Sequence, residues 1–256
     1  MKARRQSKLR PTQVLGELML TAGVLLLLFA FYESFWTNLE SAQLQKEAAE
    51  ELSDSWGEED AWVNPRGKVA PELGEAFARL YIPTFGSDYH FAVVEGTKDE
   101  HLLVGPGRYV DSQLPGQHGN FAVAGHRVGK GAPFNDLGNL QTCDAIVVET
   151  QTEWITYRVL PIGGVAADCL NQEQQAKLGA EYAGVQGLTI THPGDVAVID
   201  PVPGTQVTAQ EASEGLITLT TCHPQFSNAE RMIVHAMETS VEPKQPGQRP
   251  AVLEEK

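Results

Sequence analysis

The sequence has few positive charges and few cysteines. Its 256 residues contain 19 Lys and Arg against 33 Asp and Glu, which gives a formal net charge of −14. Because nucleic-acid binding depends on neutralising phosphates with Lys and Arg, this balance argues against a nucleic-acid partner. The three cysteines show no Cys-x-x-Cys spacing, and the histidines show no His-x₃₋₅-His spacing. We therefore predict no metal site and no cofactor.

One long apolar stretch lies near the N-terminus. Residues 1–13 are basic, and residues 14–36 form an apolar segment interrupted only by Glu17 and Glu33. As a helix this segment is about 34 Å long, enough to cross a bilayer. We predict a single-pass anchor in the cell membrane, with the basic tail in the cytoplasm and the rest of the chain extracellular. The alternative is a cleaved signal peptide, although no small-x-small site closely follows the apolar segment.

The segments on either side of the central region have compositions typical of solvated chain. Residues 37–73 are acidic and poor in large aliphatic side chains, which favours an extracellular tether with a frayed helix over residues 38–52. Trp56 and Trp62 are exceptions: they indicate either docking on the neighbouring domain or a lid over its active-site groove. Several prolines follow position 241, so residues 241–256 are predicted to be a disordered tail.

Between residues 74 and 240 the pattern changes to short apolar runs separated by Gly- and Pro-containing turns. Many short runs with this punctuation are typical of a closed β-barrel or a β-sandwich. We therefore predict an all-β domain with short helices at residues 133–140 and 172–182. The predicted strands are 77–82, 89–94, 121–124, 145–150, 154–160, 188–191, 196–199, 216–221 and 231–237.

A thiol stands at the end of one of these predicted strands. Cys222 follows the β-branched run 216–221, and Pro224 then prevents the strand from continuing in a central ladder. Arg231 opens the next predicted strand, nine positions after the thiol. Two antiparallel neighbours place such residues about 5 Å apart, so the thiol and the guanidinium should meet at one edge of the sheet. The alternative for Cys222 is a buried structural thiol, which is common in strands.

A histidine motif adds to this pair. His126 ends another short predicted strand, and Gly125 before it permits close backbone approach. Taken in order, the motifs resemble the sortase family, and their details are most similar to class E sortases of actinobacteria. The motifs are Ala-Gly-His126-Arg, Gly131-x-Pro-Phe, Asp144 to Glu149, Thr-Thr-Cys222 and Arg231. The resemblance covers residues 75–238 and implies an eight-stranded β-barrel, in agreement with the predicted strands.

The resemblance also implies a cysteine transpeptidase with three catalytic residues. Cys222 attacks the Thr–Gly bond of a C-terminal sorting signal and forms a thioacyl enzyme, and His126 protonates the leaving amine. Arg231, with its forked set of donors, stabilises the oxyanion or holds the substrate carbonyl. An amine of a cell-wall precursor or a pilus subunit then resolves the intermediate. Resemblance to class E implies a Leu-Ala-x-Thr-Gly signal.

The residues that read the substrate are less clearly indicated. Thr220 and Thr221 precede the thiol and are candidates for binding an extended peptide backbone, and Tyr109 is placed near the histidine by analogy with the family. Two residues compete for catalytic roles. His223 is a rival base because it adjoins the thiol, and Arg127 is a rival oxyanion donor because it adjoins the histidine.

The other two cysteines depart from what the family leads us to expect. Cys143 and Cys169 flank a predicted strand pair, and we hypothesise a disulfide between them that closes 26 positions. On the chain-entropy model such a bond contributes about 3.5 kcal/mol. The alternative is two unrelated buried thiols.

Two other functions remain open at this point. One is a cysteine peptidase whose thioacyl intermediate is resolved mainly by water. The other is a non-catalytic cell-surface module that uses the same barrel for assembly.

Overall fold

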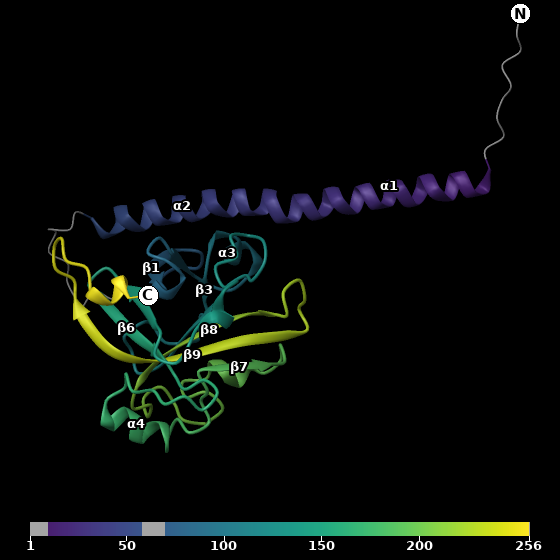
Figure 1. Ribbon diagram of the computed structural model, residues 1–256. Coiled ribbons are helices and arrows are strands. Elements are labelled where there is room, and N and C mark those ends of the chain that lie inside the picture. Colours follow the sequence, from purple (N-terminus) through teal and green to yellow (C-terminus); the bar gives the residue numbers. More distant parts are fainter. Residues whose placement is uncertain (1–9, 58–69, 256) are drawn as a thin grey trace, which may run out of the picture.

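The computed structural model describes residues 10–57 and 70–255, and in it one long helical rod lies against a β-barrel (Figure 1). The rod consists of α1 (Pro11–Phe31), a π-helical turn (Tyr32–Trp36) and α2 (Thr37–Trp56). α1 extends beyond the barrel and buries none of its residues. Among the described residues it is the one helix that is long and apolar enough to cross a membrane.

Eight strands close the barrel, which confirms the expected architecture. Their order is β6-β5-β1-β2-β3-β4-β8-β9, and β9 returns to pair with β6. A ninth strand, β7, pairs with the first part of β9, whose later part pairs with β6. The strands are β1 (Ala76–Tyr81), β2 (His90–Glu95), β3 (Gly107–Arg108), β4 (Gly119–Ala124), β5 (Ala145–Glu149), β6 (Glu153–Val159), β7 (Leu188–Thr191), β8 (Gly215–His223) and β9 (Glu230–Pro243).

Short helices fill the connections between the strands. One predicted strand is wrong, because Val196–Ile199 forms a 3₁₀ turn. Its four apolar residues stand between turn residues, and so short an apolar run does not by itself distinguish a strand from a helical turn. The helices are α3 (Asp99–Val104) and α4 (Gln172–Leu178), with 3₁₀ turns at Pro83–Phe85, Leu137–Asn139, Val196–Ile199 and Ala251–Glu254.

Alternate side chains of each strand fill the barrel. Phe121 and Val123 of β4, Leu219 of β8 and Val234 of β9 belong to the interior cluster, and each is almost fully buried. Because side chains alternate along a strand, the residues between these positions point to the outer face. On that face, Leu216 packs in a second apolar cluster with the segment around α4.

The frayed helix expected over residues 38–52 of the tether at 37–73 is present as α2, but it covers residues 37–56 and is docked on the barrel. Its buried face carries Ala48 and Leu52, which are 8% and 1% exposed. On the same face, the Gln45 amide donates to the Val104 carbonyl at 2.8 Å. Residues spaced three and four apart share one face of a helix, so this acidic segment has a stripe that fits the barrel.

Trp56 at the end of α2 docks on the barrel, as one of the two alternatives proposed. Its ring lies 4.9 Å from the Arg79 guanidinium carbon and 4.4 Å from the Lys244 ammonium. Cations over an aromatic face are attracted by its negative potential, which helps to fix this end of the helix. Trp62 lies outside the described residues.

The expectation of a disordered tail is wrong for residues 241–255. β9 continues its pairing with β6 as far as Pro243, opposite Glu153. The following 3₁₀ turn buries Leu253 in a cluster with Tyr81 and Trp154. The prolines limit regular structure in this tail, but one apolar residue and the long β9 ladder are enough to fix its path.

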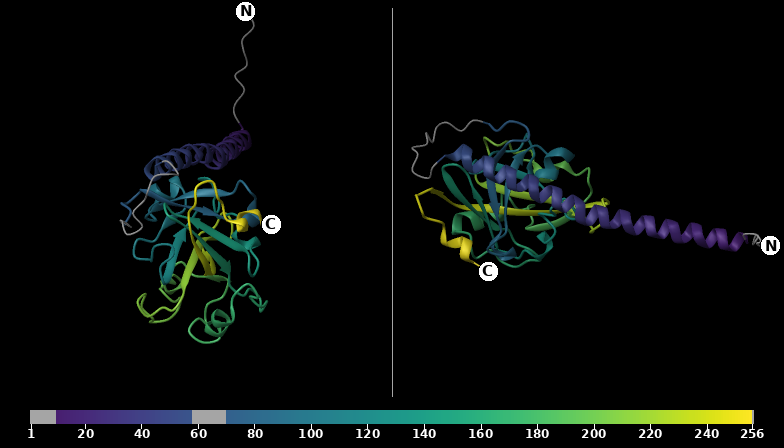
Figure 2. Two further views of the ribbon diagram at one scale, coloured as in Figure 1. Left: turned by 90° about the vertical axis from the view of Figure 1, so that its left-hand side faces the viewer. Right: turned by 90° about the horizontal axis from the view of Figure 1, so that it is seen from above.

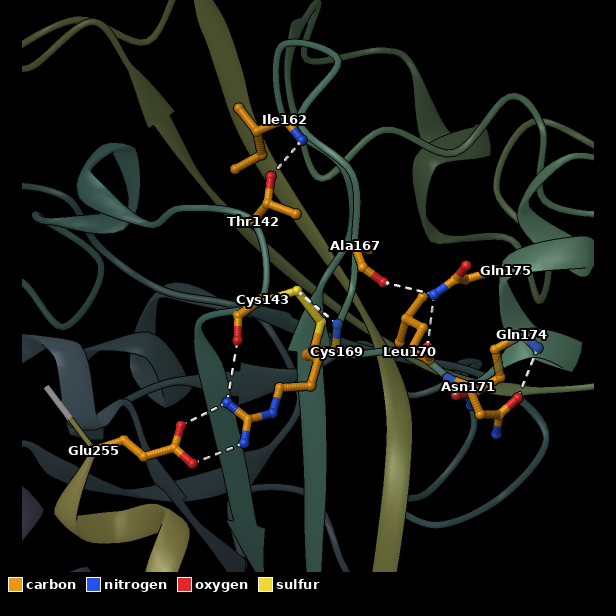
Figure 3. The surroundings of a disulfide bond; sticks show 11 residues. Thr142, Cys143, Ile162, Ala167, Cys169, Leu170, Asn171, Gln174, Gln175 and Glu255 are labelled. Atoms are coloured by element: carbon orange, nitrogen blue, oxygen red, sulfur yellow. Dashed lines mark hydrogen bonds and ion pairs between the residues drawn. A yellow bond between two sulfur atoms is a disulfide. The ribbon is translucent and has the colours of Figure 1, made fainter.

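The structure contains the hypothesised disulfide between Cys143 and Cys169. It joins the turn before β5 to the segment before α4, as Figure 3 shows. Arg158 of β6 lies beside it and donates to the Cys143 carbonyl at 3.1 Å. The same guanidinium makes a two-pronged ion pair with Glu255, with N–O distances of 2.6 and 2.8 Å. The bond and the tail therefore brace the same side of the barrel.

Candidate active site

Three residues singled out in the sequence align across neighbouring strands. Cys222 of β8 is the direct cross-strand partner of Arg231 of β9. On the other side, Ala124 of β4 pairs in parallel with Thr220, and the Gly125 N–H donates to the Thr220 carbonyl at 3.0 Å. This bond continues the ladder beyond the end of β4 and brings the next residue level with the thiol. We call His126, Cys222 and Arg231 the three-residue row.

The three-residue row emerges on the outer face of the barrel. Val123, Leu219 and Met232 point into the interior cluster. Counting alternately from these positions along each strand places every member of the row on the opposite face. Because neighbouring strands lie about 4.8 Å apart, the whole row spans two strand spacings. An imidazole, a thiol and a guanidinium are thus gathered at one edge of one face.

The thiol is partly accessible and has a neighbour that sequence reasoning missed. Cys222 is the free cysteine, with intermediate burial. Its Sγ lies 3.4 Å from Oδ1 of Asn228 and donates to it. Asn228 sits in the loop between β8 and β9. The shortness of that loop is the sequence signal for this contact, because a short loop keeps its residues close to the strand ends.

The loop that carries the imidazole is tightly held. The Phe134 N–H donates to the His126 carbonyl at 3.0 Å, and the Thr221 hydroxyl donates to the Gly125 carbonyl at 2.8 Å. A Cβ on Gly125 would lie 2.5 Å from the buried Phe134 ring, so only glycine allows this packing. Glycine is needed at position 125 because the Phe134 ring, which anchors the loop, occupies the space that a side chain would fill.

The imidazole itself is prepared for proton transfer in its neutral form. Burial, and to a smaller degree the charge of Lys130, lower the pKa of His126 to about 4, against a raising effect of Asp99. Its Nε2 is buried and has no hydrogen-bond partner among the described residues. At neutral pH, His126 therefore has a nitrogen available for a proton from the thiol or for a leaving group.

The two rival residues contact each other on the opposite face. Arg127 Nη1 donates to His223 Nδ1 at 2.6 Å and to the Cys222 carbonyl at 3.4 Å. Since Nδ1 of His223 accepts, its proton is on Nε2, which lies 4.0 Å from a Glu230 oxygen. The side chains of Arg127 and His223 therefore bond to each other and point away from the thiol.

Arg231 keeps its charge available. Its Nη1 donates to the Glu230 carbonyl at 2.9 Å. No carboxylate in residues 10–57 or 70–255 forms an ion pair with its guanidinium. A guanidinium without a carboxylate partner beside a nucleophile can receive a substrate oxygen through its remaining donors.

The candidate substrate-binding residues separate into two groups. The Tyr109 hydroxyl lies 3.1 Å from Thr220 Oγ1, so the tyrosine reaches across β4 to β8 on the face of the three-residue row. Thr221 points to the other face, where its hydroxyl is bonded to the Gly125 carbonyl. Tyr109 and Thr220 therefore lie on the face of the three-residue row, with Thr220 only 3% exposed, whereas Thr221 holds the β4–β8 edge together.

Metal ligation has no support in this region. Within the part of the chain that the structure describes, no group of three or more His, Cys, Asp and Glu side chains is arranged to hold a metal ion. The chemistry available at the site is that of a thiol, an imidazole and a guanidinium.

Comparison with known proteins gives a consistent family. A family model for the sortase domain matches residues 80–239. Sortase SrtE1 of Streptomyces coelicolor is 32% identical over 98% of this chain, which spans 66% of the length of that relative. The solved structure of a SrtF sortase from Corynebacterium diphtheriae is 57% identical, with a TM-score of 0.71, covering 77% of this chain and all of that one. Sortase E1 of Streptomyces coelicolor, solved with a tripeptide in its active site, is 30% identical, with a TM-score of 0.53, covering 72% and 99%.

Proposed function

The chain belongs to the sortase family, and on that premise we propose that it is a membrane-anchored cysteine transpeptidase of class E type. In this proposal it cleaves the Thr–Gly bond of a C-terminal Leu-Ala-x-Thr-Gly sorting signal. It then transfers the protein to an amine of a cell-wall precursor or a pilus subunit. The three-residue row is the observation that carries the proposal, because it joins a nucleophile, a proton carrier and an oxyanion donor.

The first half of the reaction begins with a neutral pair. Cys222 Sγ attacks the threonine carbonyl, and its proton passes to the free Nε2 of His126. Arg231 donates to the oxyanion of the tetrahedral intermediate. The C–N bond then breaks as His126 returns that proton to the leaving glycine amine. A thioester on Cys222 remains, and the imidazole is neutral again.

The second half runs the same proton transfers in the opposite direction. The acceptor amine attacks the thioester carbonyl and gives its proton to His126. The C–S bond breaks, and the sulfur takes up that proton as the thiol is regenerated. The neutral imidazole accepts a proton at each attack and passes it to the leaving group when the tetrahedral intermediate breaks down.

Membrane anchoring by α1 is part of the proposal. Its apolar sequence and exposed surface support a span, and the basic residues at 1–13 favour a cytoplasmic N-terminus. The barrel would then be extracellular. An oxidising compartment of that kind suits the disulfide between Cys143 and Cys169.

The test is to incubate the full chain in detergent with a Leu-Ala-x-Thr-Gly peptide, with and without an amine acceptor. We expect cleavage after threonine and a product that carries the acceptor. Product that never contains the acceptor would favour a peptidase resolved by water. Unchanged biological function in a Cys222→Ala variant would favour a non-catalytic assembly module.

A further inference from the structure

The loop that follows β4 is fastened to the first residues after the proposed membrane span. Thr37 immediately follows the π-helical turn, and its Oγ1 accepts the Lys130 N–H at 3.4 Å. Asn38 Oδ1 accepts the Gly131 N–H at 2.9 Å. One helical turn rises 5.4 Å, so this loop lies within about a turn of the end of the π-helical segment.

The π-helical segment has the composition of a membrane interface. Tyr32, Phe35 and Trp36 are each more than half exposed, and aromatic residues of this kind are enriched at the headgroup level of a bilayer. If α1 spans the membrane, these rings mark its outer surface. The loop after β4, residues 127–133, must then lie close to that surface, and His126 directly precedes it.

A second loop extends to the same side. In Figure 1 the loop between β8 and β9 lies below the rod and reaches beyond the barrel on the side toward which α1 extends, and the view from above in Figure 2 shows the same direction. This loop contains Phe226, which is 83% exposed. Its φ is +62°, a conformation that is costly for a bulky residue, so the phenyl group is displayed outward without any gain in packing.

A basic side chain belongs to the loop after β4. Lys130 forms no ion pair among the described residues, and its charge acts on His126, so it lies near the three-residue row. Most of the other basic residues of the barrel are paired with carboxylates: Arg79 with Glu149, Arg108 with Glu95, Arg158 with Glu255, Lys177 with Glu214 and Lys244 with Glu149.

We propose that the edge of the barrel bearing the three-residue row faces the lipid surface. Lys130 contacts anionic headgroups, and Phe226 inserts at the interface. A lysine near an anionic bilayer is attracted to it, and the exposed ring adds apolar burial. The inference rests on the proposed anchoring by α1. It deepens the proposed function, because such a site receives peptide bonds of proteins that are still held close to the membrane.

The experiment uses the full chain in vesicles of phosphatidylcholine and phosphatidylglycerol. In a Cys222→Ala background, which leaves no free thiol, Phe226→Cys is labelled with an environment-sensitive fluorophore. Quenching by lipids with a nitroxide on the headgroup is then measured. The matched control is Val165→Cys, which is 60% exposed in the loop before α4. In Figure 1, α4 lies on the side of the barrel away from the rod. Leu27→Cys in α1 reports on the anchor.

We expect the label at 226 to be quenched several-fold more than the label at 165, with the label at 27 protected from water. Equal, weak quenching at 226 and 165, with α1 inserted, would overturn the inference and leave the anchoring intact. A label at 27 that stays in water would overturn the anchoring and this inference with it. Reversing the charge with Lys130→Glu should lower quenching at 226; no change would refute the role of this lysine.

Discussion

At the scale of single residues, the site depends on position more than on unusual chemistry. Cys222 is an ordinary free thiol in sequence, and His126 is an ordinary histidine. The register of three strands gives them a shared face and sets Arg231 beside them. The substitutions that follow therefore test positions whose neighbours are known.

The three-residue row should be indispensable for turnover. Cys222→Ala removes the nucleophile and His126→Ala removes the proton carrier, so we expect no measurable peptide cleavage from either variant. Arg231→Lys keeps the charge but loses the forked donors, and we expect a fall in kcat of about a hundredfold. Rates are measured with the Leu-Ala-x-Thr-Gly peptide, and Gln175→Ala on α4 serves as a distant control. Activity of Arg231→Lys close to that of the parent would contradict the proposed donor role.

Asn228 should influence the thiol directly, because its Oδ1 lies 3.4 Å from Sγ. Asn228→Asp places a carboxylate there, which disfavours the thiolate, whereas Asn228→Ala only removes the hydrogen bond. We expect alkylation of Cys222 by iodoacetamide at neutral pH to be several-fold slower in the Asp variant than in the Ala variant. Equal rates would mean that the side chain at 228 is turned away from the sulfur in solution.

Acid should destabilise the fold through its buried histidines. Burial lowers the pKa of His235 to about 4, whereas an unfolded histidine has a pKa of about 6.5. As the pH falls between these two pKa values, His235 is protonated in the unfolded chain but stays neutral in the folded chain. Stability is therefore complete above pH 6.5 and declines until about pH 4, by about 3 kcal/mol for this residue.

A variant without the titrating ring checks this linkage. His235→Gln should show a flatter dependence of unfolding free energy on pH between about 6.5 and 4, although its stability at pH 7 is lower because the bond between Thr218 and Nδ1 is altered. Chemical denaturation at several pH values measures the slopes. An identical slope in the parent and in the variant would show that His235 is not the group responsible.

At the scale of elements, the two structural surprises are α2 and the C-terminal tail. The sequence predicts a frayed helix within a solvated tether for the first and a disordered tail for the second, because their compositions are acidic and proline-rich. The fold is decided instead by a few apolar positions, namely Ala48 and Leu52 on one helical face and Leu253 in the tail. The average composition of a segment does not reveal such single apolar positions. Reading the helical periodicity within residues 37–56 would have found the stripe, but the partner surface on the barrel is set by distant strands.

The disulfide is the element whose contribution is simplest to measure. Replacing both Cys143 and Cys169 with Ser should lower the free energy of unfolding by about 3.5 kcal/mol, because the unfolded chain regains the freedom of a closed loop. Denaturation under non-reducing conditions measures the loss. Cys222→Ser is the matched control, since it removes a thiol without opening a loop. A double variant as stable as that control would show that the bond constrains nothing in the unfolded chain.

At the scale of the whole molecule, the barrel and the three-residue row could be anticipated from sequence, and the details between them could not. Short apolar runs predict nine strands, resemblance to the sortase family implies an eight-stranded barrel, and the spacing of Cys222 and Arg231 places them on neighbouring strands. The two-residue strand β3 and the short loop that carries Asn228 depend on contacts between distant segments, which no local pattern records. The orientation of the barrel against α1 depends on the docking of α2 and on the hydrogen bonds accepted by Thr37 and Asn38, which join segments far apart in the sequence.

The most direct test of the central claim is to identify the residue that carries the substrate during turnover. The full chain is mixed with a Leu-Ala-x-Thr-Gly peptide without an acceptor amine, quenched in acid, digested and analysed by mass spectrometry. We expect a thioester between the threonine carbonyl and Cys222, which disappears when an amine is added and never forms in His126→Ala. An adduct on any other residue, or cleavage that continues in Cys222→Ala, would contradict the central claim.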